Sequence, residues 1–392
     1  MSLQGLFSLS IWGYVGIALL LTHITIASVT IFLHRHQAHH ALSLKPVVSH
    51  FFRFWLWLTS GIVTREWVAI HRKHHARCET VDDPHSPRIK GILTVLFGGY
   101  WLYRNEARNQ KTLAQFGHGT PDDWLEKHLY SAYPWLGISL MALIELALLG
   151  LPGLAIFVVQ MLWIPFWAAG VINGLGHYWG YRGFETSDAS TNIVPWGILI
   201  GGEELHNNHH AYAASARLSN KWWEIDLGWI YIRALAMFRL ARVKRLAPKA
   251  VSKRDRRMID RDTVRAVVSQ RFFILKHYGR IVIRPALREA RRNTDRMGRR
   301  LIRRARKLLT REDIQPDLQA TETIQRVLQQ DKTIATIYQF KQQLKEVWTR
   351  GSASQTNRVE RLQAWCAASE QSGIRALEEF AEFLRGYRLQ PA

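Results

Sequence analysis

The sequence predicts an all-α membrane protein. We expect about three transmembrane helices plus an interfacial helix, a cytoplasmic helical cap that holds a histidine site, and a basic helical C-terminal extension. Three observations predict this fold class. Uncharged apolar runs alternate with polar stretches, and ten of the 17 histidines gather in three short clusters. Almost all of the net charge of +22 lies in residues 241–311, which hold 25 Lys and Arg against 5 Asp and Glu.

The first apolar run, residues 11–33, predicts a transmembrane helix. "IWGYVGIALLLTHITIASVTIFL" contains no charged residue, and a helix needs about 20 residues to cross a bilayer. No basic segment precedes the run and no A-x-A cleavage pattern follows it, so we expect a retained span rather than a signal peptide. We expect His23, inside this span, to make one buried hydrogen bond.

Residues 133–150 and 151–172 predict a helical hairpin that crosses the membrane twice. Both segments are apolar, and the "GLPG" at their junction favours a tight turn. Glu145 lies inside the first segment. Because an ionisable group is costly in lipid, we expect Glu145 to face the helix bundle or to lie near a membrane interface.

The apolar run 46–64 predicts an interfacial helix rather than a span. The histidine clusters must lie on one face of the membrane to meet, and only 31 residues separate His39 from His71. A single crossing between these two residues would place their clusters on opposite faces. We therefore expect the N-terminus outside, and residues 65–131, 173–245 and the tail in the cytoplasm, as the positive-inside tendency favours.

The three histidine clusters indicate a metal site. They are "HRHQAHH" (34–40), "HRKHH" (71–75) and "HNNHH" (206–210). Histidine is the commonest metal ligand, and side chains at i, i+3 and i+4 share one face of a helix. His71, His74 and His75 can therefore point the same way, as can His206, His209 and His210, and each of these triplets can give two or three nitrogens to one place. His177 and Asn173 in "NGLGH", again four residues apart, are further candidates. So many ligands exceed the capacity of one ion, so we expect two metals.

The same motifs resemble the three histidine boxes of the integral-membrane fatty acyl desaturases, of the stearoyl-CoA Δ9 desaturase type. The boxes correspond to "HRHQAH", "HRKHH" and "HNNHH", and supporting matches are "REWVAIHRKHH", "DDPHSP", "NGLGHYWGYR" and "GGEELHNNHH". The resemblance covers roughly residues 12–245. It is closest to bacterial members, since the animal enzymes have one more span at the front.

The resemblance implies a di-iron site in the cytoplasmic cap, with two Fe2+ ions held by nine histidines and with Asn173 reaching one metal through a water. The nine are His34, His39, His71, His74, His75, His177, His206, His209 and His210. His36 and His40 fall off the first-box pattern, and we expect them around the site or on the surface. We expect His85 to be a structural residue near the site.

The resemblance also implies the reaction. O2 and two electrons convert a saturated acyl chain, carried by CoA or by a lipid, into a chain with a cis double bond at Δ9. No cytochrome b5-like "HPGG", ferredoxin-type cysteine run or GxGxxG occurs in the sequence. We therefore expect a separate ferredoxin-, cytochrome b5- or flavin reductase-like electron donor. Trp163, Trp167 and Trp196 either line a slot for the acyl chain or pack as ordinary core residues. The expected location is the inner (cytoplasmic) membrane, multi-pass.

Two other classes of protein stay open. A related di-iron membrane hydroxylase uses similar clusters, although the HxxxxH first box and the NxxxH before the third box favour a desaturase. A membrane metal transporter would place its ligands inside the spans near the midplane, whereas these clusters follow the spans in polar segments. A zinc protease would carry HExxH, which is absent.

The charge distribution predicts two domains, a membrane desaturase domain over 1–245 and a basic helical cytoplasmic extension over 246–392. Basic residues near a membrane favour contact with anionic lipids. The extension is therefore either a solvated helical tail or a segment that adheres to the anionic bilayer surface. We expect no nucleic-acid partner, because the front of the chain is a membrane protein.

Overall fold

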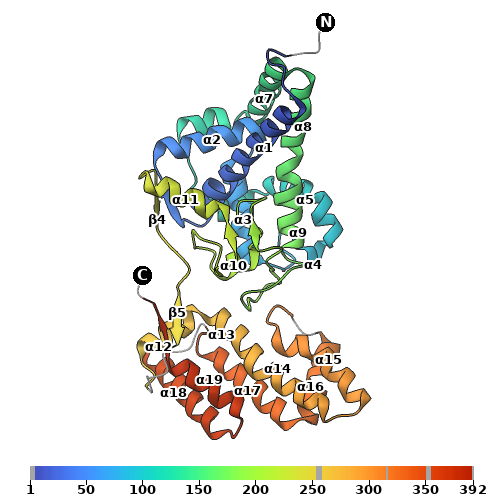
Figure 1. The fold of residues 1–392 in the computed structure, drawn as a ribbon, viewed down its shortest axis with the longest axis vertical. Coiled ribbons are helices and arrows are strands. Elements are labelled where there is room, and N and C mark those ends of the chain that lie inside the picture. The colour runs from blue at the N-terminus through green and yellow to red at the C-terminus, as the bar shows by residue number, and fades with distance from the viewer. Residues whose placement is uncertain (1–4, 253–257, 315–316, 350–354, 391–392) are drawn as a thin grey trace. The chain divides into compact units, whose positions relative to one another are not determined.

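The chain forms two units in the computed structural model (Figure 1), which describes residues 5–252, 258–314, 317–349 and 355–390. The first unit comprises Met1–Arg182 and Asp188–Ala247, and the second comprises Gly183–Ser187 and Pro248–Ala392. Residues 253–257 of the basic window lie outside the described residues. Both units are mostly helical, as the sequence predicts.

Among the described residues, two helices are long and apolar enough to cross a membrane, Ile11–Ala38 and Leu151–Leu175. The first joins α1 (Ile11–Ala27) to the π-helix η1 (Ser28–Ala38), and the second joins α8 (Leu151–Ile164), the π-helix η3 (Pro165–Ile172) and α9 (Asn173–Leu175). Helix α7 (Pro134–Leu149) is also apolar but has 16 residues. By length and composition, the structure therefore supports two of the three expected spans.

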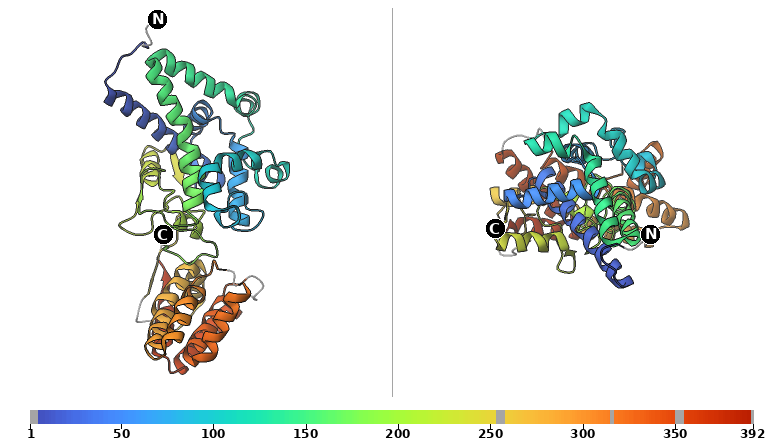
Figure 2. Two further views of the ribbon diagram at one scale, coloured as in Figure 1. Left: turned by 90° about the vertical axis from the view of Figure 1, so that its right-hand side faces the viewer. Right: turned by 90° about the horizontal axis from the view of Figure 1, so that it is seen from above.

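Helices α7 and α8 form the expected hairpin (Figure 2). Gly150 turns the chain between them at φ +69, a conformation that glycine adopts without steric cost. A Cβ on Gly153 would collide with the carbonyl oxygen of Glu145, so this glycine lets the two helices approach closely. Glu145 is 3% exposed and accepts a hydrogen bond from the amide of Gln160 on α8. The prediction that this glutamate faces the bundle is confirmed.

Helix α2 (Pro46–Ser60) does not separate the first two histidine clusters. Gly61, at φ +58, ends it and leads into α3 (Thr64–Arg77). Arg53 on α2 is 5% exposed and pairs with Asp123 at 2.5 Å and with Glu126 at 2.9 Å. The arginine in this apolar helix is therefore neutralised by the segment that leads into α7. His23 makes its expected hydrogen bond, with the hydroxyl of Tyr231 at 2.5 Å.

The rest of the first unit packs around the lower ends of α1 and α8 as they are drawn in Figure 1. Its core includes Ile26, Phe32, Leu33, Leu42 and Leu56. Strands β1 (Leu42–Leu44) and β4 (Ala241–Val243) pair antiparallel, and β2 (Trp196–Gly197) and β3 (Ile225–Asp226) pair parallel. The remaining elements are α4 (Pro87–Lys90), α5 (Ile92–Ala107), α6 (Gln110–Phe116), η2 (Glu126–Tyr130), α10 (His206–Ala211), α11 (Leu227–Met237), β1 (Leu42–Leu44), β2 (Trp196–Gly197), β3 (Ile225–Asp226) and β4 (Ala241–Val243).

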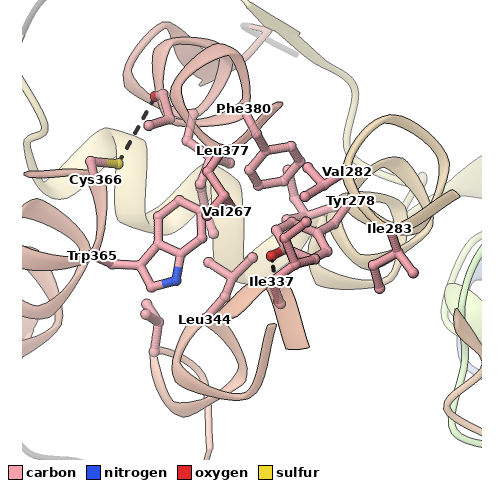
Figure 3. Close-up of a cluster of buried hydrophobic side chains, with 14 of the residues drawn as sticks. Val267, Tyr278, Val282, Ile283, Ile337, Leu344, Trp365, Cys366, Leu377 and Phe380 are labelled. Atoms are coloured by element: carbon pink, nitrogen blue, oxygen red, sulfur yellow. Dashed lines mark hydrogen bonds between the residues drawn. The ribbon is translucent and has the colours of Figure 1, made fainter. Parts of the chain in front are cut away.

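The second unit has a hydrophobic core of its own (Figure 3). Trp365, Leu377 and Phe380 pack there with Tyr278, whose hydroxyl donates to the carbonyl of Ile337 at 2.7 Å. The elements of this unit are β5 (Ala250–Ser252), α12 (Arg261–Ser269), α13 (Arg271–Tyr278), η4 (Gly279–Ile283), α14 (Arg284–Arg292), α15 (Arg296–Thr310), α16 (Leu318–Gln330), α17 (Lys332–Glu346), α18 (Gln355–Gln371), α19 (Arg375–Arg385) and β6 (Tyr387–Leu389).

The helices of the second unit are amphipathic and well capped. On α15 the buried residues are Gly298, Ile302, Ala305 and Leu309, spaced three or four apart as one helix face requires. Aspartate side chains cap the N-termini of α12, α15, α16 and α17, where they accept otherwise unpaired backbone N–H groups. The C-terminal segment is therefore a folded helical unit rather than a loosely solvated tail.

Candidate metal centre

Five histidines from three elements converge in a first cluster. η1 carries His34 and is followed by His39, α3 carries His71 and His75, and α10 carries His209. The Nε2 atoms of His39 and His71 lie 2.8 Å apart. Nε2 of His209 lies 3.1 Å from Nε2 of His34 and 2.8 Å from Nε2 of His75. All three sequence clusters therefore contribute to this group.

Four histidines form a second cluster beside the first. Nε2 of His177 lies 3.2 Å from Nε2 of His74 and 2.9 Å from Nε2 of His206. Nε2 of His210 lies 3.1 Å from Nε2 of His206. The structure thus brings all nine predicted histidines together. It divides the second and third sequence clusters between the two groups, so each of these triplets gives two nitrogens to one group and one to the other, within the two or three that the spacing predicts.

The separations of these nitrogens fit a shared cation. Two imidazole nitrogens that face each other at 2.8–3.2 Å repel unless a proton or a metal lies between them. A metal–nitrogen bond of about 2.0–2.1 Å places neighbouring ligand nitrogens about 2.8–3.0 Å apart around an octahedral ion and about 3.3–3.4 Å apart around a tetrahedral ion. The observed distances lie within these limits. An all-imidazole donor set suits Fe, Zn or Cu.

Buried or partly buried carboxylates orient four of the nine rings. Each accepts the Nδ1–H of a histidine, which fixes the ring and leaves Nε2 free to bind a metal. The pairs are Glu203 with His34 (2.7 Å), Asp83 with His74 (3.0 Å), Glu79 with His177 (3.2 Å) and Asp188 with His210 (3.2 Å). These four carboxylates are not among the residues predicted for the site, although "DDPHSP" and "GGEEL" place two of them beside the histidine motifs.

The electrostatics of the site favour neutral imidazoles and ionised carboxylates. Burial, and then the charges of neighbouring side chains, lower the pKa values of six of the histidines well below normal, so these rings are neutral at pH 7 and can bind a metal. The six are His39, His71, His75, His177, His206 and His209. Burial alone would raise the pKa of Asp83, but the charge and the hydrogen bond of His74 lower it well below normal.

An apolar cavity of about 690 Å3 reaches the clusters. Its wall near the clusters includes His34, His71 and His206. From there it runs between α5 and the α8–η3 helix to the start of α7. Gly99 and Gly170 let these helices approach closely, because a Cβ on either glycine would collide with backbone of the opposite helix. The size and mostly apolar lining of the cavity suit an apolar ligand that reaches the histidines.

The other predicted residues take different positions. Asn173 lines the same cavity as His206. His85 stacks on His74 with ring centres 4.4 Å apart and also lines the cavity. His36 contacts the carbonyl of Leu42 and His40 contacts Arg72, so neither joins a cluster.

Two further side chains border the clusters and were not expected there. The indole of Trp67 stacks on His71 with ring centres 4.9 Å apart. Sγ of Cys78 lies 4.0 Å from Nε2 of His74 and 3.9 Å from Nδ1 of His177. Burial raises the pKa of this thiol well above normal, so it is protonated at pH 7. Trp67 lies within the quoted motif "REWVAIHRKHH", whereas no sequence pattern distinguished Cys78.

The three tryptophans considered for an acyl slot do not line this cavity. Trp163 packs against the core of the first unit and against Trp167, with ring centres 5.8 Å apart. Trp196 is 60% exposed. Of the two interpretations of these residues, ordinary packing fits Trp163 and Trp167.

Comparisons with known proteins match both parts of the chain. A model of the fatty acid desaturase family matches residues 9–236, and a model described as a transposase matches residues 262–390, less than half of the chain. The sn-1 stearoyl-lipid 9-desaturase of Anabaena variabilis is 32% identical over 61% of this chain and 86% of its own length. The Delta-9 acyl-lipid desaturase 1 of Arabidopsis thaliana is 28% identical over 59% and 74%. The icosanoyl-CoA 5-desaturase of Limnanthes douglasii is 31% identical over 57% and 63%.

Proposed function

This chain belongs to the fatty acid desaturase family and is an oxidoreductase that desaturates fatty acids. We propose that it introduces a cis Δ9 double bond into a saturated, lipid-bound acyl chain. One observation carries the proposal: nine imidazoles form two adjoining clusters, and three of them, His34, His71 and His206, line a mostly apolar cavity. The position of the double bond rests on the names of the relatives, among which 9-desaturases are frequent.

We propose that the two clusters hold two iron ions through the nine histidines, with Asn173 as a further, water-mediated contact. Bound iron would supply the oxidation that removes one hydrogen from each of two neighbouring methylenes; with two electrons from a separate donor protein and two protons, O2 would be reduced to two molecules of water. The protein itself positions the acyl chain and excludes water from the site. Apolar walls order the acyl chain, and the four carboxylates hold the Nδ1 protons that keep the rings in place.

The rim of the cavity supports a lipid-bound substrate over a soluble one. Phe97, Trp135, Leu162 and Phe166 line the cavity and are 42–72% exposed. Exposed apolar side chains at the mouth of a cavity match the interior of a bilayer better than water. An acyl chain attached to a membrane lipid therefore enters from the side, without leaving the hydrocarbon phase.

A polar corner of the same cavity suits the ester end of such a substrate. Glu66, Tyr103 and Arg104 line it between α3 and α5. The hydroxyl of Tyr103 is buried and has no hydrogen-bond partner among the described residues. It is free to donate to an ester carbonyl. Replacement of Tyr103 by Phe should raise KM for the lipid substrate more than it lowers kcat.

The direct test is lipid analysis after expression in a host that lacks desaturases, with the acyl-lipid and acyl-CoA donors supplied separately to isolated membranes. We expect 9-unsaturated acyl lipids from the wild type and none from His206→Ala or His209→Ala. The variants should still insert into the membrane. A hydroxylated product would instead favour the related di-iron hydroxylases. Purified protein should hold two irons per chain, and zinc in their place would contradict the proposal.

We propose that the protein lies in the inner membrane with the N-terminus outside and the histidine clusters facing the cytoplasm. α7 is then the third span, and the hairpin that α7 forms with α8 returns the chain to the cytoplasmic side, where the clusters lie. Cysteine residues introduced one at a time, with an impermeant thiol reagent, test this topology. Labelling of a cysteine at Asp82 from outside intact cells would refute it.

We propose two domains, a desaturase domain over 1–245 and an accessory domain over 246–392 that contacts anionic lipid. Helices α14 and α15 expose eleven basic side chains, none of which makes an ion pair with a described residue. They are Arg284, Arg288, Arg291, Arg292, Arg296, Arg299, Arg300, Arg303, Arg304, Arg306 and Lys307. Each basic residue near an anionic leaflet contributes about 1 kcal/mol, so a few contacts are enough to hold this face on the membrane.

The basic face can be tested in nanodiscs that contain either zwitterionic or anionic lipid. Hydrogen exchange of peptides from α14–α15 should slow only in the anionic discs, and added salt should abolish the effect. Arg299→Gln combined with Arg303→Gln should weaken it, whereas Arg375→Gln, on α19, should not. The transposase-like match makes nucleic acid the alternative occupant. Protection by duplex DNA without protection by anionic lipid would replace our proposal.

A further inference from the structure

The second unit includes a five-residue segment from the middle of the first. Gly183–Ser187 belongs to the loop between α9 and α10, yet it packs as part of the C-terminal unit. The backbone N–H of Glu185 donates to the carbonyl of Phe272 at 3.0 Å. Its carboxylate lies 3.5 Å from Nε of Arg311 and 4.0 Å from Nζ of Lys276. Glu185 is 3% exposed. This segment, the strap, is therefore anchored by backbone and side chain.

The residues that follow the strap hold the second histidine cluster. Asp188 accepts the Nδ1–H of His210 at 3.2 Å. The backbone N–H of Ala189 donates to Oε1 of Glu79 at 2.7 Å, and the same oxygen accepts the Nδ1–H of His177 at 3.2 Å. Two of the four rings in this cluster are therefore oriented by residues within two positions of the strap.

The chain between anchor and carboxylate is too short to move independently. Glu185 and Asp188 are three residues apart, a span of at most about 11 Å. The loop around them has little regular structure, and such loops are usually the least stable parts of a fold. An anchor on Glu185 therefore restricts the positions that Asp188 can sample. The first cluster has a different support, because Glu203 is held by the hydroxyl of Thr30 at 2.6 Å.

We propose that the C-terminal unit is a positioning element for the second histidine cluster. By holding the strap it fixes Asp188 and Ala189, which keep the rings of His210 and His177 aimed at one metal. The inference rests on the proposed metal centre and adds that the two metal sites differ: retention of one metal depends on the C-terminal unit, and retention of the other does not.

The test uses full-length protein in nanodiscs. Iron release into an excess of chelator is measured for the wild type, Glu185→Ala, Asp188→Asn and the double variant. Loss of a residue that orients a ligand costs 10–100-fold in metal affinity. We expect Glu185→Ala to release one of the two irons about 10-fold faster and the other at the wild-type rate. Because part of the effect of Glu185 passes through Asp188, the double variant should fall short of the product of the single effects. Glu289→Ala, an exposed glutamate of the same unit, is the matched control.

Hydrogen exchange of metal-free protein gives a second readout. Peptides that contain residues 188–190 should exchange faster in Glu185→Ala than in the wild type or in Glu289→Ala. If Glu185→Ala unfolds the C-terminal unit, Glu185→Gln replaces it, since it keeps one acceptor oxygen for the N–H of Glu312. Unchanged exchange at 188–190, multiplicative effects in the double variant, or equal release of both irons would overturn the inference. A wild-type protein that never holds two irons would contradict the proposed function, while the exchange result would still decide whether the strap positions this loop.

Discussion

Replacement of Asp83 by Asn should lower the metal affinity of the second histidine cluster without changing the shape of the site. Asp83 is 1% exposed and accepts the Nδ1–H of His74. Its Oδ2 also accepts the backbone N–H of Glu79 at 2.7 Å, and its Oδ1 accepts that of His85 at 3.1 Å. An asparagine has only one acceptor oxygen. Whichever way its amide is turned, the NH2 group faces one of these two backbone N–H groups.

The size of the effect follows from this mismatch. A buried donor left without an acceptor costs about 1–3 kcal/mol. Loss of an outer-shell partner of a metal-binding histidine lowers metal affinity about 10–100-fold, equivalent to about 1.4–2.7 kcal/mol. The two estimates agree, so we expect Asp83→Asn to lower affinity for one iron about 10–100-fold. Affinity for the iron in the first cluster should stay within about threefold.

The assay is equilibrium competition with an Fe2+ chelator, followed by metal analysis of the protein, with desaturation of acyl lipid measured in parallel. Asp122→Asn is the control, since the Asp122 side chain is 79% exposed and pairs only with Lys127 among the described residues. Asp83→Asn protein that is folded, as judged by its thermal unfolding, and yet holds both irons with wild-type affinity would refute the idea that this carboxylate orients His74.

Three further predictions concern packing, each measured by thermal or denaturant unfolding in detergent. Gly170→Ala should destabilise the first unit by about 1–3 kcal/mol, because its Cβ would collide with a backbone carbonyl of α5, whereas Gly16→Ala, in open space, should not. Gln160→Leu should destabilise the first unit by about 1–3 kcal/mol because it leaves the buried Glu145 without its hydrogen-bond donor. Gln160→Leu combined with Glu145→Leu should recover most of the lost stability. A double variant less stable than the single one would argue against this. Tyr278→Phe should destabilise the second unit by about 1 kcal/mol through loss of one buried hydrogen bond, and an unchanged midpoint would show that the bond contributes nothing.

Much of the site followed from local spacing. The i, i+3 and i+4 spacing of the second and third clusters predicted which histidines a helix can present together, and the family resemblance selected His34 and His39 in the first. The structure brings all nine predicted histidines into two adjoining groups. Apolar run lengths likewise predicted the first span and the hairpin. The requirement that the clusters meet predicted that residues 46–64 do not carry the second cluster away from the first. These features depend on one segment at a time, or on whether the chain can connect two of them.

Which histidines share a group was decided by the tertiary structure. His74 and His75 are adjacent in sequence but lie in different clusters, as do His209 and His210. Successive side chains on a helix point about 100° apart, so neighbours turn toward different partners once α3 and α10 pack together. The sequence names the ligands that each helix offers, and only the packing of helices decides which of them meet.

The supporting residues were also beyond the reach of local patterns. Glu79 and Asp188 are 109 residues apart, yet they orient His177 and His210 in the same cluster. The strap at Gly183–Ser187 is shorter than any element that periodicity identifies, and its membership of the C-terminal unit depends on contacts with Phe272 and Arg311. By itself the sequence determined the ligand types and the membrane-like helices, because both depend on residues that are close together along the chain. The pairing of rings, carboxylates and strap arises from long-range contacts that form only when the helices pack.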